Sequence, residues 1–271
     1  IDAEFLDARK VIKTDNNFTS AQVLKTETYY YIKEEFSRIN KLRVITGFIA
    51  STHENETTTL GRGGSDYTVA IFGAALEVDE IEIWTDVDGV LTADPRKVTD
   101  SFIVNELSYE EAMELSYFGA KVIYAPTIQP AMDLEIPVRI KNSFNPDHPG
   151  SIIKKTPGKN TNEITGLASI DNIALLRVEG GGMVGVTGIA GRLFRTLALN
   201  RINVVLITQA SSEHSICVAV EPKSASIAVK HLAKEFEEEI RSGKISTVEK
   251  EEGLSVIAVV GGNMRHRHGV S

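Results

Sequence analysis

Residues 57–66 read TTTLGRGGSD, in which hydroxyl side chains and glycines surround a single arginine and a single carboxylate. An apolar run at 44–49 predicts a strand leading into this stretch, and a run with helical spacing at 67–75 follows it directly. A glycine-rich turn between a strand and a helix lets backbone N–H groups approach a ligand, and the helix N-terminus adds partial positive charge. Arg62 adds a fork of donors that fits a carboxylate or a phosphate. The stretch therefore predicts an anion-binding loop, and the alternative is an ordinary turn capped by one of its own side chains.

Strands and helices alternate on both sides of this loop. The predicted helices are residues 28–39, 67–75, 108–118 and 126–134, and the predicted strands are residues 41–50, 81–84 and 136–141. Ser108 and Glu111 form a capping-box pattern, and Pro137 near the start of the last strand is typical of an edge strand. The alternation predicts a mostly parallel sheet with helices on both faces. The long loop at 85–96 then lies at the end of a strand, where ligands bind in open α/β sheets.

A second pattern begins after turn-rich segments at 145–160. The predicted strands are residues 173–178, 204–208 and 215–220, and the predicted helices are residues 189–199 and a helix opening at Ser224. This β-α-β-β-α order is the start of a ferredoxin-like unit. Residues 173–183 also align without a gap against residues 254–264, which predicts a second copy of the unit that stops at Ser271. The predicted divisions are residues 1–155, a linker at 156–170, a first unit at 171–251 and a truncated second unit at 252–271.

Composition narrows the classes of function. The net charge of −8 and the pI of about 5.4 argue against nucleic-acid binding, which needs a basic face. No apolar run approaches the roughly 20 residues of a membrane span. The single cysteine, Cys217, fits a reducing cytoplasm, and the six histidines show no spacing typical of a metal site. The charged N-terminus, with neither an initiator methionine nor a signal peptide, predicts a chain that belongs to a longer protein.

Several long motifs resemble one family. TTTLGRGGSD at 57–66, WTDVDGVLTADPR at 84–96 and FGAKVIYAPT at 118–127 resemble the aspartokinases of the amino-acid kinase fold. The residues after 165 resemble ACT regulatory domains. There, GGGMVGVTG followed by INVVLITQASSE is more similar to the threonine-sensitive bifunctional aspartokinase/homoserine dehydrogenases than to the lysine-sensitive monofunctional enzymes. The resemblance implies the C-terminal part of a carbamate-kinase-like α/β domain, followed by ferredoxin-like ACT units.

The resemblance also implies a reaction and its residues. The family transfers the γ-phosphoryl group of MgATP to the side-chain carboxylate of L-aspartate. The implied aspartate-binding residues are Arg62, Gly63, Gly64 and Ser65, and the implied nucleotide-binding residues are Thr85, Asp86, Arg96, Lys121 and Val122. Asp66 orients the loop or caps the helix, and we expect capping. Mg²⁺ is expected to arrive with the nucleotide and not in a protein metal site.

An effector site is implied in the ACT region. Its expected residues are Met183, Val184, Gly185, Asn203, Ile207 and Gln209. A helix N-terminus suits the carboxylate of an amino acid, and a glutamine amide suits a threonine hydroxyl, so threonine is expected rather than lysine. The alternative for Gln209 is an exposed amide at a strand end. ACT units pair across subunits in the family, which implies a homodimer or a larger assembly.

Two departures limit what the chain does alone. The Lys-Phe-Gly-Gly-Thr-Ser segment of the family is absent, and Leu91 stands where many members have tyrosine. We therefore expect the 271 residues by themselves to be catalytically inactive. Two other functions stay open: an amino-acid-sensing module that transfers nothing, and an amino-acid kinase that acts on glutamate, carbamate or a nucleotide.

Overall fold

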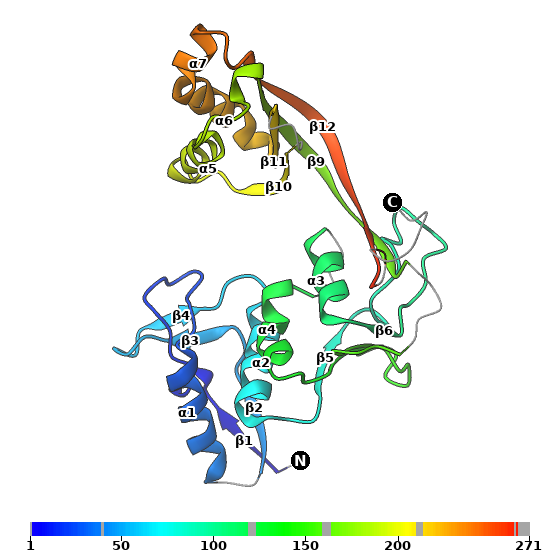
Figure 1. The fold of residues 1–271 in the computed structure, drawn as a ribbon. Coiled ribbons are helices and arrows are strands. Elements are labelled where there is room, and N and C mark those ends of the chain that lie inside the picture. The colour runs from blue at the N-terminus through cyan, green and yellow to red at the C-terminus, as the bar shows by residue number, and fades with distance from the viewer. Residues whose placement is uncertain are drawn as a thin grey trace. The chain divides into compact units, whose positions relative to one another are not determined.

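A computed structural model describes residues 2–38, 41–118, 123–158, 164–209, 214–262 and 264. The chain forms two compact units (Figure 1). Unit 1 contains Ile1–Ala168 and Ala258–Ser271, and unit 2 contains Ser169–Ile257.

The N-terminal part of unit 1 packs two small sheets against helices. Its elements are β1 (Ala3–Leu6), the 3-10 helix η1 (Ala8–Lys10), α1 (Lys25–Ser37), β2 (Leu42–Ile45), β3 (Ile49–Ser51), β4 (Thr57–Thr59) and α2 (Gly64–Leu76). β1 and β2 pair in parallel, whereas β3 and β4 pair antiparallel. The fully buried Ile12, Ile32 and Ile71 lie in one apolar cluster that joins η1, α1 and α2. The predicted strand at 44–49 is two strands, because Phe48 adopts a φ of 74° that breaks the extended chain.

The second sheet of unit 1 has four strands in the order β5-β7-β8-β6. The elements here are β5 (Ile81–Thr85), β6 (Glu106–Leu107), α3 (Tyr109–Tyr117), α4 (Ala125–Asp133), β7 (Val138–Asn142) and β8 (Ser151–Ile153). β5 and β7 are parallel, as are β6 and β8, but β7 and β8 are antiparallel, so the fold is mixed α/β. The prediction that β7 is an edge strand is wrong. Pro137 lies just before the strand and contributes only its carbonyl, which accepts a 2.9 Å hydrogen bond from Ile81 N.

The predicted capping box at the start of α3 is confirmed. The Ser108 hydroxyl accepts from Glu111 N at 3.1 Å, and Ser108 N donates to Glu111 Oε2 at 2.8 Å. The buried Glu111 carboxylate also accepts from the Thr165 hydroxyl, so both of its oxygens have partners.

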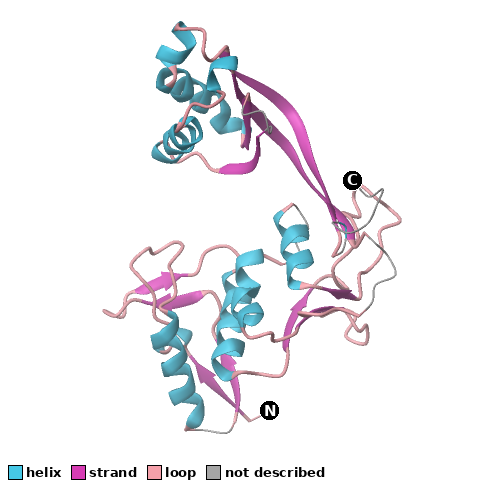
Figure 2. Cartoon of the chain, viewed as in Figure 1, coloured by secondary structure: helices cyan, strands magenta, loops and turns pink. Residues whose placement is uncertain are grey.

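Unit 2 has the ferredoxin-like order of elements that the sequence predicts. They are β9 (Gly166–Glu179), η2 (Gly181–Met183), α5 (Ile189–Leu199), β10 (Val204–Gln209), β11 (Ser215–Val220), α6 (Pro222–Glu235), α7 (Glu237–Arg241) and β12 (Thr247–Val260). The sheet order is β10-β11-β9-β12, and α5 and α6 pack together beside this sheet (Figure 2). Leu176, Leu193 and Leu232 are fully buried between the sheet and the helices. The predicted helix at 189–199 and strand at 215–220 are confirmed to the residue.

The strands β9 and β12 are neighbours in the sheet and form a long two-stranded ribbon. The two strands are equal in length, and their spacing along the chain is that of the two copies of the sequence repeat. They begin at residues 166 and 247 and end at residues 179 and 260, so both ends are offset by the same 81 residues. Thr165 N donates to Val260 O at one end, and Ser246 N donates to Glu179 O at the other, each at 2.8 Å. This common register places Asn172 opposite Gly253, and the two residues have positive φ values of 53° and 73°.

Two of the predicted domain divisions fall within the strands of this ribbon. The expected boundary between residues 251 and 252 falls inside β12, and the expected linker at 156–170 includes the first residues of β9. The assignment of the residues after 251 to a second ACT unit stays a prediction.

Candidate functional site

The glycine-rich loop connects β4 to α2 through two left-handed residues. Gly61 and Gly63 have φ values of 75° and 68°, a conformation that other residues adopt only with strain. Gly63 is the N-cap of α2, and among the described residues no side chain makes a hydrogen bond to the cap. The expectation that Asp66 caps the helix is therefore wrong, because α2 begins at Gly64 and Asp66 lies inside its first turn. Gly64 N donates to Gly61 O at 3.1 Å, and no described side chain caps the N–H groups of the first turn, an arrangement that suits an anion.

The starts of two helices meet at this loop. Tyr124 is the N-cap residue of α4, and Thr127 lies in the first turn of that helix. A Cβ atom on Gly63 would lie 2.9 Å from both Tyr124 Cβ and Thr127 Cγ2, so only glycine allows this approach. The two positive helix ends therefore lie side by side, with Arg62 next to them. The predicted Lys121 and Val122 precede α4 and lie outside the described residues.

Two aromatic residues that sequence reasoning missed flank the loop. Arg62 Cζ lies 5.3 Å from the centre of the Tyr124 ring, a cation–π arrangement. Phe48 lies against Gly64, where a Cβ would come within 2.6 Å of Phe48 Cδ2. The positive φ of Phe48 is the kind of backbone strain that clusters at functional sites. Tyr124 belongs to a motif already quoted and could have been found there, whereas nothing in the sequence signals the backbone angle of Phe48.

Asp66 is a partly buried carboxylate beside the loop. Burial raises the pKa of its carboxyl group. Within the part of the chain that the structure describes, no group donates a hydrogen bond to it. Glu111, by contrast, has a described partner for each of its two carboxylate oxygens.

Thr85 and Asp86 lie at the same edge of unit 1 as the glycine loop. β5 ends at Thr85, and the Thr85 hydroxyl lies 3.2 Å from Asp86 Oδ1. A short turn joins α2 to β5, and Gly73 packs directly on Ile81, so the helix and the strand run in opposite directions. The N-terminus of α2 and the carboxyl end of β5 therefore point to one edge, where α/β sheets bind ligands.

Arg96 is held by its neighbour Asp94. The Arg96 guanidinium donates to the two carboxylate oxygens of Asp94 at 3.0 Å from Nε and 2.6 Å from Nη2. This hydrogen bonding lowers the pKa of Asp94 to about 2. In the structure the Arg96 side chain is thus already engaged with a carboxylate, although it is 74% exposed.

The predicted effector residues of unit 2 fall into two groups. The side chain of Met183 is buried in the core, so only its backbone could face a ligand. Val184 and Ile207 are 51% and 54% exposed, and Asn203 and Gln209 are exposed as well. Gly185 has a φ of 70°, in the loop between η2 and α5.

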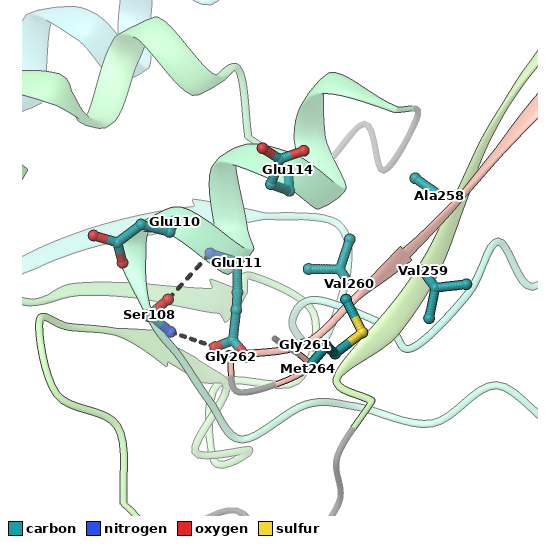
Figure 3. Close-up of a pocket in the computed structure, with 10 residues that line it drawn as sticks. All are labelled: Ser108, Glu110, Glu111, Glu114, Ala258, Val259, Val260, Gly261, Gly262 and Met264. Atoms are coloured by element: carbon teal, nitrogen blue, oxygen red, sulfur yellow. Dashed lines mark hydrogen bonds between the residues drawn. The ribbon is translucent and has the colours of Figure 1, made fainter. Parts of the chain in front are cut away.

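A pocket of about 470 Å³ lies elsewhere in unit 1, between α3 and the end of β12 (Figure 3). Its lining includes Glu110, Glu111, Glu114, Gly262 and Met264, and none of the predicted site residues. Glu111 turns toward Ser108 in Figure 3, in keeping with its capping-box bonds. The pocket is acidic but lacks a buried side chain in need of a partner, and we assign it no ligand.

The described ranges hold no group of three His, Cys, Asp or Glu side chains that could bind a metal ion. In the same ranges no helix has both the length and the apolar character needed to cross a membrane.

Comparison with known proteins identifies the family. Residues 1–142 match the amino acid kinase family, and residues 176–236 match an ACT domain. A chloroplastic bifunctional aspartokinase/homoserine dehydrogenase 2 from Arabidopsis thaliana is 46% identical over 237 residues, which are 86% of this chain and 26% of the relative. The chain thus spans about a quarter of that relative's length.

Solved structures agree with this match. E. coli aspartokinase III in complex with aspartate and ADP superposes with a TM-score of 0.81 at 32% identity, over 100% of this chain and 60% of that chain. The same enzyme in complex with lysine and aspartate gives a TM-score of 0.76 at 33% identity, over 97% of this chain and 58% of that one. The match of residues 1–142, which is more than half of the chain, shows that this chain belongs to the amino acid kinase family, with an ACT domain matched at residues 176–236.

Proposed function

We propose that the protein is an aspartokinase, which transfers the γ-phosphoryl group of MgATP to the side-chain carboxylate of L-aspartate to give 4-phospho-L-aspartate. This is the first step of the pathway to threonine, lysine and methionine. The observation that carries the proposal is the contact of two helix starts at Gly63, beside Arg62. Paired helix ends and a guanidinium suit the anionic groups of both substrates. The complex of E. coli aspartokinase III with aspartate and ADP supports this choice of substrates.

In this proposal the glycine loop binds one substrate and the carboxyl end of β5 binds the other. Arg62, Gly63, Gly64 and Ser65 bind aspartate, and Asp66 orients the loop or the substrate. Thr85, Asp86, Arg96, Lys121 and Val122 bind the nucleotide. Cationic groups beside the polyphosphate would stabilise the charge of the transition state, which is the main demand of phosphoryl transfer.

Mg²⁺ fits this site as a companion of the nucleotide. The described residues offer isolated carboxylates such as Asp66 and Asp86 and no cluster of three metal-binding side chains. Such a donor set suits an ion that keeps water and phosphate ligands. When bound, Mg²⁺ would neutralise phosphate charge, and the chain's own residues would orient the two substrates.

We propose further that unit 2 senses an amino acid and that threonine is the inhibitor. Val184, Gly185, Asn203, Ile207 and Gln209, with the backbone of Met183, would contact it. Lysine is the second candidate, because E. coli aspartokinase III has been solved with lysine. Pairing of ACT units would make the protein a dimer or a larger assembly. A module that senses an amino acid without catalysis is the alternative function.

The similarity to bifunctional enzymes supports a parent protein that also carries a homoserine dehydrogenase. For its location we propose the cytoplasm, on the basis of the single cysteine.

The test is an aspartyl-phosphate assay with hydroxylamine trapping, with and without threonine or lysine. We expect a longer polypeptide carrying this chain to turn over aspartate, with inhibition by threonine alone, and the 271 residues alone to be inactive. Inhibition by lysine alone would keep the kinase and replace the effector. Absence of turnover on aspartate in the longer polypeptide would reject the proposed reaction.

A further inference from the structure

A tight turn after β7 presents an aromatic side chain to solvent. Asn145 N donates to Asn142 O at 3.2 Å, and Phe144 N donates to Asn142 Oδ1 at 2.8 Å. Phe144 at the tip is 85% exposed, the largest exposed fraction among the large apolar side chains that the structure describes. A single exposed apolar residue on a loosely held loop is common and does not indicate a site.

The turn is anchored at several points. Asp88 Oδ1 accepts from Asn142 Nδ2 at 2.8 Å and from Asn145 Nδ2 at 3.1 Å. Ser143 N donates to Thr85 O at 2.8 Å. These bonds fix the turn to the loop after β5, so the backbone of Phe144 is held beside the end of that strand. The exposed ring adds little to packing, because it buries little of its surface.

The anchoring bonds also place the turn that carries Phe144 next to the proposed nucleotide site. Thr85, which Ser143 contacts directly, precedes Asp86, and both are proposed nucleotide-binding residues. Asp88 belongs to the same loop, and its carboxylate is used for holding the turn. An aromatic face next to a phosphate-binding edge is the arrangement on which nucleic-acid bases stack.

We propose that Phe144 is the platform on which the base of the nucleotide stacks. The inference rests on the proposed nucleotide site at Thr85 and Asp86. Asp88, Asn142 and Asn145 act as positioning residues that hold the platform in place.

Trp84 provides a direct readout in the 271-residue chain. It is the only tryptophan in the sequence, it immediately precedes Thr85, and the residue is 45% exposed. Emission from Trp84 can therefore follow titrations with MgATP and with inorganic tripolyphosphate, which has the phosphates but no base. We expect Phe144→Ala to weaken MgATP binding about tenfold and to leave tripolyphosphate binding unchanged. Phe144→Tyr keeps an aromatic face and should bind MgATP within about twofold of the unmodified chain.

A matched control is Phe5→Ala, because Phe5 is 70% exposed on β1 and is not held at this edge. This control should bind both ligands normally. Unchanged MgATP affinity in Phe144→Ala would overturn the stacking role, and so would an equal loss for MgATP and tripolyphosphate. If the unmodified chain bound neither ligand, the proposed nucleotide site would fail, and the platform with it.

Discussion

The guanidinium of Arg62 lies over the ring of Tyr124, with Cζ 5.3 Å from the ring centre. Arg62 comes from the glycine loop and Tyr124 from the cap of α4, so this contact joins the two helix starts of the proposed aspartate site. The ring restricts where an exposed arginine can point, and a restricted arginine loses less entropy when it pairs with a carboxylate.

Removal of the Tyr124 ring should therefore weaken the binding of aspartate. We expect Tyr124→Ala to raise the KM for L-aspartate about fivefold, while Tyr124→Phe retains the cation–π contact and a nearly normal KM. The measurement is steady-state kinetics on an active polypeptide that carries this chain. Tyr30→Ala, which removes a tyrosine that is 61% exposed on α1, is the control and should change nothing. Equal KM values for Tyr124→Ala and Tyr124→Phe would remove Tyr124 from the site.

Replacement of glycine by alanine should change the free energy of unfolding in opposite directions at Gly63 and at Gly191. Gly63 has a φ of 68°, and an added Cβ meets Tyr124 and Thr127, so Gly63→Ala should lower the free energy of unfolding by about 1–3 kcal/mol. Gly191 lies within α5 with open space around its Cβ position, so Gly191→Ala should raise it by about 0.5–1 kcal/mol. Urea unfolding followed by Trp84 emission reports on unit 1, and far-UV circular dichroism reports on both units. A Gly63→Ala chain as stable as the unmodified one would mean that the two helix starts do not touch.

The ion pair of Asp94 and Arg96 should be visible in a pH titration. The pKa of Asp94 is lowered from its ordinary value of 3.8 to about 2, chiefly by the hydrogen bond from Arg96. A carboxyl group with a depressed pKa contributes stability above its unfolded pKa, and that contribution is lost as the pH falls from about 3.8 through about 2. NMR of the carboxyl carbon should give a midpoint near 2 for Asp94, which returns toward 3.8 in Arg96→Ala. A midpoint near 3.8 in the unmodified protein would show that Arg96 does not hold Asp94 in solution.

Gln209 tests the proposed effector site. Loss of its amide should weaken threonine binding about tenfold in Gln209→Ala, because a hydrogen bond to the effector hydroxyl disappears. Thr208→Ala is the matched control, since adjacent residues of β10 point to opposite faces of the sheet. Calorimetric titration with threonine and with lysine measures the change. Equal affinities in the unmodified chain and Gln209→Ala would exclude Gln209 from the site.

The elements that sequence predicts well are those whose signals are local. The helix at 189–199 and the box of Ser108 and Glu111 follow from side-chain spacing and from hydrogen bonds within one turn. Pro137 misled the prediction because a proline just before a strand does not interrupt the ladder, and only the tertiary fold shows that β7 has a neighbour on each side.

The site was predictable only in part, for a similar reason. The type of ligand follows from the glycines and Arg62, which are consecutive in sequence. The contact of Gly63 with Thr127 and the anchoring of Phe144 by Asp88 join residues far apart in the chain. Asp66 was expected to cap α2, but the left-handed Gly63 takes that place and starts the helix earlier.

The hydrogen bonds at the two ends of β9 and β12 share one register, and in that register Asn172 falls opposite Gly253. Both passages of the chain between the units occur in the ribbon of β9 and β12, at residues 168–169 and 257–258. Removal of residues 173–252 would join Asn172 directly to Gly253. The resulting Asn-Gly dipeptide is favoured in two-residue hairpin turns with positive φ at both positions, and both residues already have positive φ. Residues 173–252 are therefore an insertion in sequence whose removal would leave a dipeptide suited to closing β9 and β12 as a hairpin.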